Sequence, residues 1–493
     1  MKKISYLFSV YLLLTIIFIS CNKNNDDDVP VSQNLEVQDF IWEGLNLYYL
    51  WKDNVPNLSD TKVNDADEYI SMLSAHPNPD DFFESLIYDR QNTDKWSWIV
   101  DDYIALENLF QGITKSNGVE YGLFFETGSS SNVFGYVRYI LPNSDASPKN
   151  IERGFIFDAI SGTQLTIDNY RSLLGNETYT MNFANLNGGN PISNGTSVEL
   201  TKFEYQENPV YITKIIDVGG VKIGYLMYNS FTSVFDQELN TAFAQLQAEG
   251  ATELILDLRY NSGGSVRTAT YLASMITGQF NDELLTKEKW NNDLQDWFEA
   301  NHPDWLVNNF TNEIYNTDAN NNVILQEAIN SLTLSNLYVI TTGSSASASE
   351  LIINGLNPYI NVVTIGGKTS GKYTASITLY DSDDFGREGA NQNHTWAMQP
   401  IVLEEINKLG VNDTDGFDPT IPLEENLVSL GELGDVTEPL FARAIAEITG
   451  SGKLIISNDK MLFFERASDS KELTKLGNTM YVEKQLPLGI IRR

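Results

Sequence analysis

The sequence is poor in the residues that hold metal ions and disulfides. One cysteine and three histidines occur among 493 residues. A single cysteine excludes a disulfide framework and any cysteine-rich metal site. The histidines, at positions 76, 302 and 394, share no close spacing, which argues against zinc catalysis. We therefore expect no metal and no cofactor.

Positive charge is also scarce. Lys and Arg number 32 against 66 Asp and Glu, which gives a formal net charge of −34. This excess of negative charge disfavours binding to phosphate backbones and to anionic lipid surfaces, because both need clustered cations. We therefore expect no nucleic acid partner. With 42% hydrophobic and 20% charged residues, the chain is not wholly disordered, collagen-like or a coiled coil. Its length predicts about three domains.

An apolar run at the N-terminus predicts export. Two lysines precede the apolar residues 4–19, and the single cysteine, Cys21, follows them. A short positive region before such a run is typical of a signal peptide. The segment Phe18-Ile19-Ser20-Cys21 resembles a bacterial lipobox, although Phe stands where Leu is usual. We predict a signal peptide over residues 1–20 and lipidation of Cys21; the alternative is a cysteine inside an uncleaved anchor.

Residues 21–33 are polar and acidic, with the run Asn22-Lys23-Asn24-Asn25-Asp26-Asp27-Asp28, and predict a flexible tether. Similar acidic runs follow the cysteine in some surface-exposed lipoproteins. We therefore expect an outer-membrane lipoprotein of the bacterial cell envelope, facing the periplasm or the cell surface. The membrane partner would be reached through the lipid on Cys21.

Three folded parts are predicted after the tether. Residues 34–112 place apolar side chains at helical spacing and indicate a small helical domain. Residues 209–449 alternate strand and helix patterns, which is typical of a buried, largely parallel sheet. Between them, residues 115–208 read as short alternating strands with one late helix. Residues 450–493 are expected to be a separate tail of two or three short strands. The predicted fold class is multidomain α/β.

The strand-rich part resembles a PDZ domain. It carries a glycine turn before an apolar strand, in the segment Tyr121-Gly122-Leu123-Phe124. PDZ domains bind the C-terminus of a peptide by strand addition, with backbone N–H groups holding the carboxylate. The resemblance implies that Tyr121, Gly122, Leu123 and Phe124 form the carboxylate loop and bind peptide. The alternative is an unrelated small β-domain.

One unusual segment of the α/β part is Leu256-Asp257-Leu258-Arg259-Tyr260-Asn261-Ser262-Gly263-Gly264. A buried strand ends here in a polar turn with two glycines. Consecutive glycines let backbone N–H groups face a ligand. The carboxyl end of a strand is where open α/β sheets place their sites. A plain tight turn is the alternative.

A second segment, residues 343–372, contains a strand-to-helix connection and then a strand followed by a glycine-rich loop. Gly343-Ser344-Ser345-Ala346-Ser347-Ala348-Ser349-Glu350 precedes a helix, whose first N–H groups are free to bind an oxyanion. A serine there is also a good helix cap. The glycine-rich loop that follows ends at Lys372, and a lone loop lysine is usually solvated. Each feature alone leaves these alternatives open.

Together the segments resemble the C-terminal processing, or tail-specific, serine peptidase family. That family uses a Ser/Lys pair in a crotonase-like (ClpP-like) α/β core. Its nucleophile lies in an S-A-S-A-S-E segment and its base in a T-F-G-K-G loop, 25 positions later. Ser347 and Lys372 are also 25 positions apart. The resemblance covers residues 211–449 and the order of the PDZ-like insert.

The resemblance implies a serine endopeptidase acting on proteins or peptides. Ser347 would be the nucleophile and Lys372 the general base, and Glu350 would orient the pair. The backbone N–H groups of Ala348 and of the Gly263-Gly264 turn would form the oxyanion hole. A lysine can act as the base only if burial lowers its pKa from about 10.4.

The sequence departs from the family pattern beyond the lysine. Several members carry a glutamine four residues after the base, and here that position is Ser376. The loop reads Thr369-Ser370-Gly371-Lys372-Tyr373 rather than T-F-G-K-G. These differences keep open an inactive, peptidase-like lipoprotein that only binds peptides. Acyl-CoA chemistry, which the crotonase-like core also hosts, is disfavoured by export and by the Ser/Lys pair.

Overall fold

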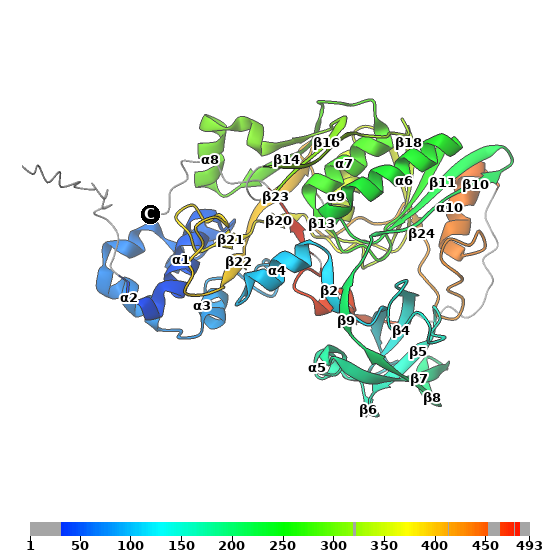
Figure 1. Cartoon of the computed structure of the whole chain (residues 1–493), viewed down its shortest axis with the longest axis horizontal. Coiled ribbons are helices and arrows are strands. Elements are labelled where there is room, and N and C mark those ends of the chain that lie inside the picture. The colour runs from blue at the N-terminus through cyan, green and yellow to red at the C-terminus, as the bar shows by residue number, and fades with distance from the viewer. Residues whose placement is uncertain (1–30, 319–321, 413, 452–463, 478, 484–493) are drawn as a thin grey trace, which may run out of the picture.

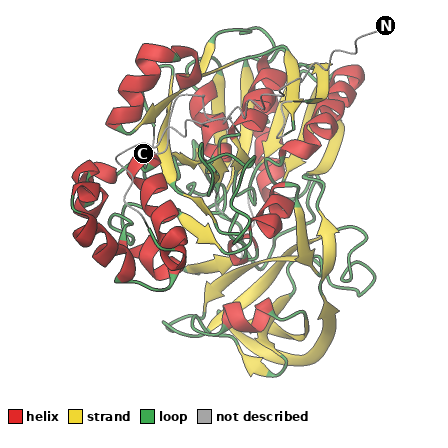
Figure 2. Cartoon of the chain, turned by 60° about the vertical axis from the view of Figure 1, so that its left-hand side comes forward, coloured by secondary structure: helices red, strands yellow, loops and turns green. Residues whose placement is uncertain are grey.

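The computed structural model describes residues 31–318, 322–412, 414–451, 464–477 and 479–483. The predicted signal peptide, Cys21 and most of the tether lie outside the described residues. The chain forms a helical part, a β-rich domain and an α/β core, in that order (Figure 1). Figure 2 shows the core helices grouped around its strands, and the β-rich domain below them with one short helix.

The helical part contains four α-helices, and side-chain caps start the second, third and fourth of them. Asp65 accepts hydrogen bonds from two amides at the start of the second helix, and Asn78 followed by Pro79 opens the third. The helices and the strand that follows the third are α1 (Glu36–Tyr48), α2 (Ala66–Ser74), α3 (Pro79–Ser85), β1 (Trp98–Val100) and α4 (Tyr103–Phe110).

The helical part is not independent of the core. Helix α1 buries Phe40, Leu45 and Tyr48 in the same hydrophobic cluster as the α/β core. The ring of Tyr48 meets that of Phe385 edge-on, with centroids 5.6 Å apart. Strand β1 pairs with β22 (Ala397–Gln399), which pairs in turn with β21 (Leu379–Tyr380). This shared packing fixes residues 31–112 against the loops that follow the core strands.

The β-rich domain has its own hydrophobic core. Its sheet is ordered β25-β3-β4-β5-β7-β8, with β6 paired to β5. Apolar side chains of β3, β4, β5 and β7 and of helix α5 form one cluster. The elements are β3 (Val119–Phe125), β4 (Val133–Ile140), β5 (Ile156–Ile160), β6 (Thr163–Gln164), α5 (Tyr170–Gly175), β7 (Thr178–Asn187) and β8 (Asn190–Thr201). Strands β2 (Ile113–Ser116) and β9 (Phe203–Gln206) form an antiparallel pair where the chain enters and leaves the β-rich domain.

The α/β core is built on a six-stranded sheet. Its order is β10-β11-β12-β18-β19-β24, and all neighbours are parallel except β10 with β11. The strands are β10 (Val210–Val218), β11 (Val221–Tyr228), β12 (Glu253–Asp257), β18 (Asn336–Thr341), β19 (Asn361–Gly366) and β24 (Ile421–Pro422). This agrees with the alternating strand and helix patterns of the sequence.

Helices cover both faces of this sheet because alternate strand residues are apolar on each face. Leu254 and Leu256 pack with α6 (Asp236–Glu249), α7 (Val266–Thr277) and α9 (Ala348–Leu356). Ile255 packs on the opposite face with α10 (Pro439–Thr449). Helices α6, α7 and α10 each end at a glycine in the left-handed conformation, the usual helix C-cap.

A second sheet joins distant parts of the chain. Its order is β13-β26-β20-β23-β14-β15. The strands are β13 (Gly264–Ser265), β14 (Leu284–Trp290), β15 (Val307–Asn309), β20 (Thr374–Ser376), β23 (Ile401–Asn407) and β26 (Met480–Tyr481). Helix α8 (Asn292–Asn301) contacts β14, and the hairpin of β16 (Glu313–Thr317) and β17 (Val323–Ala328) is hydrogen-bonded to helices α6 and α7. The strands β13 and β20 adjoin the two segments singled out in the sequence.

The C-terminal segment, residues 464–477 and 479–483, is not a separate tail, contrary to the prediction for residues 450–493. Strand β25 (Arg466–Asp469) adds to β3 of the β-rich domain, and β26 pairs with β13 and β20 of the core. Figure 1 shows this segment in red between the two. Strands of four and two residues carry almost no periodicity, so the sequence gives no sign of their partners.

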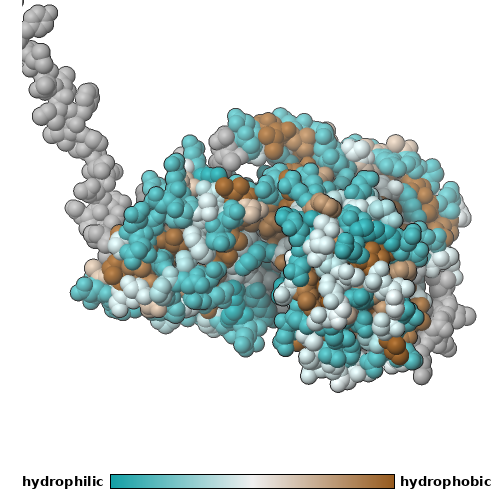
Figure 3. Space-filling model, turned by 60° about the horizontal axis from the view of Figure 1, so that its bottom comes forward, coloured by the Kyte–Doolittle hydropathy of each residue, from teal (hydrophilic) through white to brown (hydrophobic). Residues whose placement is uncertain are grey.

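The described residues include no helix long and apolar enough to cross a bilayer. Viewed from below, hydrophilic residues dominate the surface, and hydrophobic residues form small scattered patches (Figure 3).

Candidate active site

The two segments singled out in the sequence meet at the carboxyl ends of neighbouring parallel strands, β12 and β18. Hydrogen bonds join them directly. Ser345 Oγ donates to the carbonyl of Leu258 at 2.8 Å, and Ser349 Oγ donates to the carbonyl of Asn261 at 2.9 Å. The amide of Ala346 donates to the same Asn261 carbonyl at 3.1 Å. The small serines and alanine therefore allow one turn to lie against the other.

Ser347 sits on a strained turn between β18 and α9. Its φ is +65° and its ψ is −118°, a conformation that residues with a Cβ rarely adopt. Its side chain is fully buried, and its Oγ makes no hydrogen bond within the described part of the chain. Such strain costs on the order of 1–3 kcal/mol and gathers at functional sites. A buried, unpaired hydroxyl on a strained turn is typical of a nucleophile.

The glycine turn faces this serine. A Cβ on Gly263 would lie 2.6 Å from both Cβ and Oγ of Ser347, so no larger residue fits there. The amide of Gly263 donates to Asn261 Oδ1 at 2.9 Å, and Gly264 pairs with Met480 in β26. Ala348 opens helix α9, where amides lack intrahelical partners. The structure thus gathers the predicted oxyanion donors near Ser347, with the Gly263 amide turned to Asn261.

Lys372 is on the loop that follows β19. Its side chain and that of Ser347 line one cavity of about 20 Å³, which has room for roughly one water molecule. The lysine side chain is buried, and its Nζ lies 5.6 Å from the ring centre of Trp96. Burial lowers the pKa of Lys372 to about 7, although the nearby Asp94 and Glu350 carboxylates act to raise it. A large part of the lysine is therefore uncharged at neutral pH.

Glu350 ties the serine turn to the lysine loop. Its carboxylate accepts hydrogen bonds from the backbone amides of Ser347 at 2.8 Å and Lys372 at 2.9 Å. It also accepts from the Gly371 amide and from Thr369 Oγ1, both at 2.6 Å. Burial raises the pKa of Glu350, and the hydrogen bonds oppose that rise. Because all four partners donate, they favour the ionised carboxylate.

A buried arginine supports the first segment from behind. Arg259 is fully buried and forms ion pairs with Asp257 at 2.7 Å and Glu438 at 2.8 Å. Glu438 also caps helix α10 by accepting from the Phe441 amide. The network fixes the end of β12 relative to α10, and hence the glycine turn that follows.

Sequence reasoning missed Asp94 and Trp96, two residues of the helical part that lie near Lys372. Asp94 is fully buried and accepts hydrogen bonds from the Tyr49 hydroxyl at 2.8 Å and the Ser97 amide at 2.9 Å. Trp96 lies two residues further along. No local motif marks these residues, because their role depends on a contact across more than 270 positions.

Ser376, which stands where the family has glutamine, donates from Oγ to the Met480 carbonyl at 3.2 Å. The Ser376 hydroxyl therefore contacts the C-terminal segment. Within the described residues, no three His, Cys, Asp or Glu side chains gather to hold a metal ion.

The four predicted peptide-binding residues lie within strand β3 and do not form a loop, so the expectation of a carboxylate loop at Tyr121–Phe124 is wrong. One edge of β3 pairs with β4 and the other with β25. In register, Gly122 lies opposite Asp469 and Leu123 opposite Ser468. Residues 119–125 form one strand with a register irregularity between Glu120 and Tyr121, and Gly122 lies inside this strand, not in a turn before it.

We predict that Ser347 reacts with a serine-directed fluorophosphonate at a rate that rises with pH and has a midpoint near pH 7. A lysine amine can accept a proton only in its neutral form, and the pKa of Lys372 is about 7. Labelling for fixed times at pH values from 5 to 11 measures this midpoint. Lys372→Met should abolish the pH-dependent labelling, and Lys368→Met, at an exposed lysine on the same loop, should not. A midpoint near 10 contradicts the assignment.

We predict that Glu350→Gln slows labelling about tenfold or more, because an amide nitrogen then faces backbone donors that need an acceptor. The loss should appear in the maximal inactivation rate, with the probe concentration for half-saturation little changed. Glu447→Gln, on the outer side of α10, is the matched control. Equal rates for both variants would show that Glu350 does not position the pair.

Comparisons with known proteins agree with this geometry. Residues 222–386 match the family description "Peptidase family S41", and residues 36–98 match "Peptidase S41 N-terminal domain". A carboxyl-terminal-processing protease of Picosynechococcus sp. is 26% identical over 254 residues, which cover 51% of each chain. A chloroplastic C-terminal processing peptidase of Tetradesmus obliquus is 23% identical over 316 residues, 62% of this chain and 61% of that one. The chain thus spans about half to three-fifths of the length of these curated relatives.

Among solved structures, a putative S41 protease from Bacteroides fragilis superposes with a TM-score of 0.61. It is 24% identical, and the match covers 84% of this chain and 98% of that one. The likeness shows that the two share a multidomain α/β fold with an N-terminal helical region. These findings agree with the resemblance inferred from the sequence: two regions of this chain match S41 peptidase family models, and curated proteins similar to it are named C-terminal processing proteases.

Proposed function

We propose that the protein is a serine endopeptidase in which Ser347 is the nucleophile and Lys372 the general base. One observation carries the proposal: a buried lysine with a pKa near 7 lines the same small cavity as an unpaired serine hydroxyl on a strained turn. A serine hydroxyl is a weak nucleophile until an adjacent base takes its proton. The substrates would be proteins or peptides.

The reaction would run through an acyl-enzyme. The Lys372 amine takes the proton of Ser347 Oγ as the oxygen attacks the scissile carbonyl carbon. The protonated lysine then gives that proton to the departing amine, and a water molecule hydrolyses the ester with the lysine again acting as base. The oxyanion would be held by the amides of Ala348 and of the Gly263-Gly264 turn, once the Gly263 amide leaves Asn261.

Two fold assignments belong to the same proposal. The core would be crotonase-like (ClpP-like), which is supported by its parallel sheet with helices on both faces. The β-rich domain would be PDZ-like, which is supported by an edge strand, β3, that accepts an added strand beside helix α5. Peptide recognition by β3 would then precede cleavage at Ser347.

The second candidate function is peptide binding without cleavage. It is favoured by two hydrogen bonds: the Gly263 amide donates to Asn261, and the Ser376 hydroxyl donates to the Met480 carbonyl. A protein of this kind would bind peptides at the same site and would not hydrolyse them.

The two functions differ in one experiment. We predict that the full chain cleaves casein and is labelled by a fluorophosphonate, and that Ser347→Ala and Lys372→Ala each lose both activities. Ser349→Ala, two residues along the same helix start, is the control for disturbed packing and should retain labelling. Unchanged labelling of Ser347→Ala would reject the nucleophile. Peptide binding with no turnover and no labelling of the unaltered chain would support the second candidate.

We further propose that lipid on Cys21 anchors the protein in the bacterial outer membrane, facing the periplasm or the surface. The lipobox-like segment supports this. We predict that Cys21→Ala moves the protein from the membrane pellet to the soluble fraction of expressing cells. Substitution of Ser20 by Ala is the control and should leave it in the pellet. Membrane association that survives Cys21→Ala would contradict lipidation.

A further inference from the structure

The C-terminal segment lies along the β-rich domain as a peptide ligand would. It runs antiparallel to β3, from Phe124 toward Tyr121. The amide of Phe125 donates to the Glu465 carbonyl at 2.9 Å, and the amide of Ser470 donates to the Tyr121 carbonyl at 3.0 Å. Addition of a strand to an open sheet edge is a general mode of peptide binding. The edge of this domain is therefore occupied by the chain itself.

Helix α5 closes the other side of the segment. The Tyr170 hydroxyl donates to Ser468 Oγ at 3.3 Å, and Arg171 donates from Nη1 to the Glu472 carbonyl at 2.9 Å. Ala467 and Leu473 pack against the hydrophobic core of the domain. The segment thus fills a groove between a strand and a helix, with apolar side chains inward and backbone groups paired.

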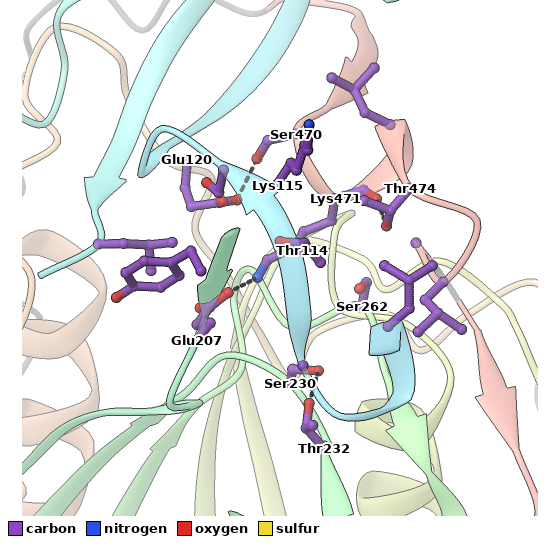
Figure 4. A pocket seen from close by; sticks show the side chains of 18 of the residues that line it. Thr114, Lys115, Glu120, Glu207, Ser230, Thr232, Ser262, Ser470, Lys471 and Thr474 are labelled. Carbon is purple, nitrogen blue, oxygen red and sulfur yellow. Dashed lines mark hydrogen bonds and ion pairs between the residues drawn. The ribbon is translucent and has the colours of Figure 1, made fainter. Parts of the chain in front are cut away.

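Lys471 of this segment forms an ion pair with Glu207, and the acidic side chain of Glu120 is nearby. Lys471 Nζ lies 2.7 Å from Glu207 Oε2, and the adjacent Ser470 Oγ donates to Glu120 Oε2 at 2.6 Å. Figure 4 shows both carboxylates turned toward the segment, and Lys471 joined to Glu207. Burial lowers the pKa of Lys471, but the charges of Glu207 and Glu120 outweigh it and raise that pKa. Burial raises the pKa of Glu120, and the charge of Lys471 opposes that rise, so a cation at this position favours the ionised pair. The pair would therefore repel a peptide carboxylate and attract a basic side chain.

A cavity connects this acidic pair to the glycine turn. Its volume is about 460 Å³, within the range of ligand pockets. Glu120, Tyr121 and Lys471 line one part of it, and Gly263 and Gly264 line another. A peptide held at β3 therefore has an open path to the neighbourhood of Ser347.

The same chain continues along this path. A Cβ on Gly263 would lie 3.0 Å from the Thr479 carbonyl oxygen and 2.6 Å from Ser347 Oγ, so these two atoms are near neighbours. Met480 pairs with Gly264 and lines the cavity shared by Ser347 and Lys372. A substrate backbone at this position would meet the backbone of residues 479–481.

The segment is also tied to the nucleophile turn. Asp469 is buried and forms an ion pair with Arg138 of β4 at 2.9 Å. The Ser344 hydroxyl donates to the same carboxylate at 2.8 Å, three residues before the nucleophile. Burial raises the pKa of Asp469, but Arg138 and Arg466 outweigh it and hold that pKa well below its ordinary range. Departure of the segment would therefore alter contacts of the turn that carries Ser347.

We propose that β3, α5 and the pair Glu120 and Glu207 form a binding site for an extended peptide with a basic side chain, and that residues 465–474 of the same chain fill this site until such a peptide displaces them. The inference deepens the proposed function, because the incoming peptide would be the substrate. The binding itself needs no catalysis, so it is tested apart from cleavage.

The test uses full-length protein with Ser347→Ala and a fluorescent peptide, ERASDSKELT, that repeats residues 465–474 and is blocked at both ends. A tethered segment competes at an effective concentration in the millimolar range, so the starting protein should bind the peptide weakly. Lys471→Glu places a third negative charge at the pair and should tighten peptide binding about tenfold or more. Lys475→Glu makes the same charge change at an exposed position of the segment and is the matched control.

Two further measurements make the result specific. A peptide with its lysine replaced by alanine should bind the Lys471→Glu protein about tenfold more weakly, because the acidic pair then has no cation. Amide hydrogen exchange of residues 465–473 should speed up in Lys471→Glu and return toward the starting rate in Lys471→Glu with Glu207→Lys. Equal peptide affinities and equal exchange in the Lys471→Glu and Lys475→Glu proteins would overturn the inference. Tightened binding together with no labelling of any chain that retains Ser347 would support the site and reject the peptidase.

Discussion

The exclusion of water from the amine of Lys372 is the constraint on which the rest of the structure depends. Burial lowers its pKa to about 7 against the pull of two carboxylates. A shift of this size corresponds to about 5 kcal/mol in favour of the neutral amine. The unfolded chain would bind the proton more tightly, so this cost is fully present below pH 7 and disappears as the pH rises past the ordinary lysine pKa. Under the proposed function, stability is given up here for a base that works at neutral pH.

Several distant parts of the chain maintain that burial. The helical part supplies Trp96 and Asp94, which explains why it shares one hydrophobic cluster with the core. Glu350 holds the lysine loop against the serine turn, and the C-terminal segment closes the remaining side through Met480. The site is therefore assembled from residues near positions 95, 263, 347, 372 and 480.

The sequence predicted the parts of the site that are encoded locally. Strand ends with two glycines, or with a run of small residues before a helix, identified the turns at Gly263 and Ser347, and the spacing to Lys372 supported the family. The sequence did not indicate Asp94, Trp96 or the placement of β25 and β26. Those depend on contacts between short or irregular segments far apart in the chain, where no periodic pattern specifies the partner. The fold class followed from the alternation of strands and helices, whereas the sharing of one core by the helical part and the α/β part did not.

The most direct test of this account is the pKa of Lys372 itself, measured by NMR titration of the full chain with labelled lysine side chains. Comparison with the spectrum of Lys372→Met assigns the resonance. The account predicts that one lysine titrates near pH 7 and that its signal is missing from the variant. A Lys372 that remains charged up to pH 10 would contradict it, because the buried amine could then not take a proton from Ser347.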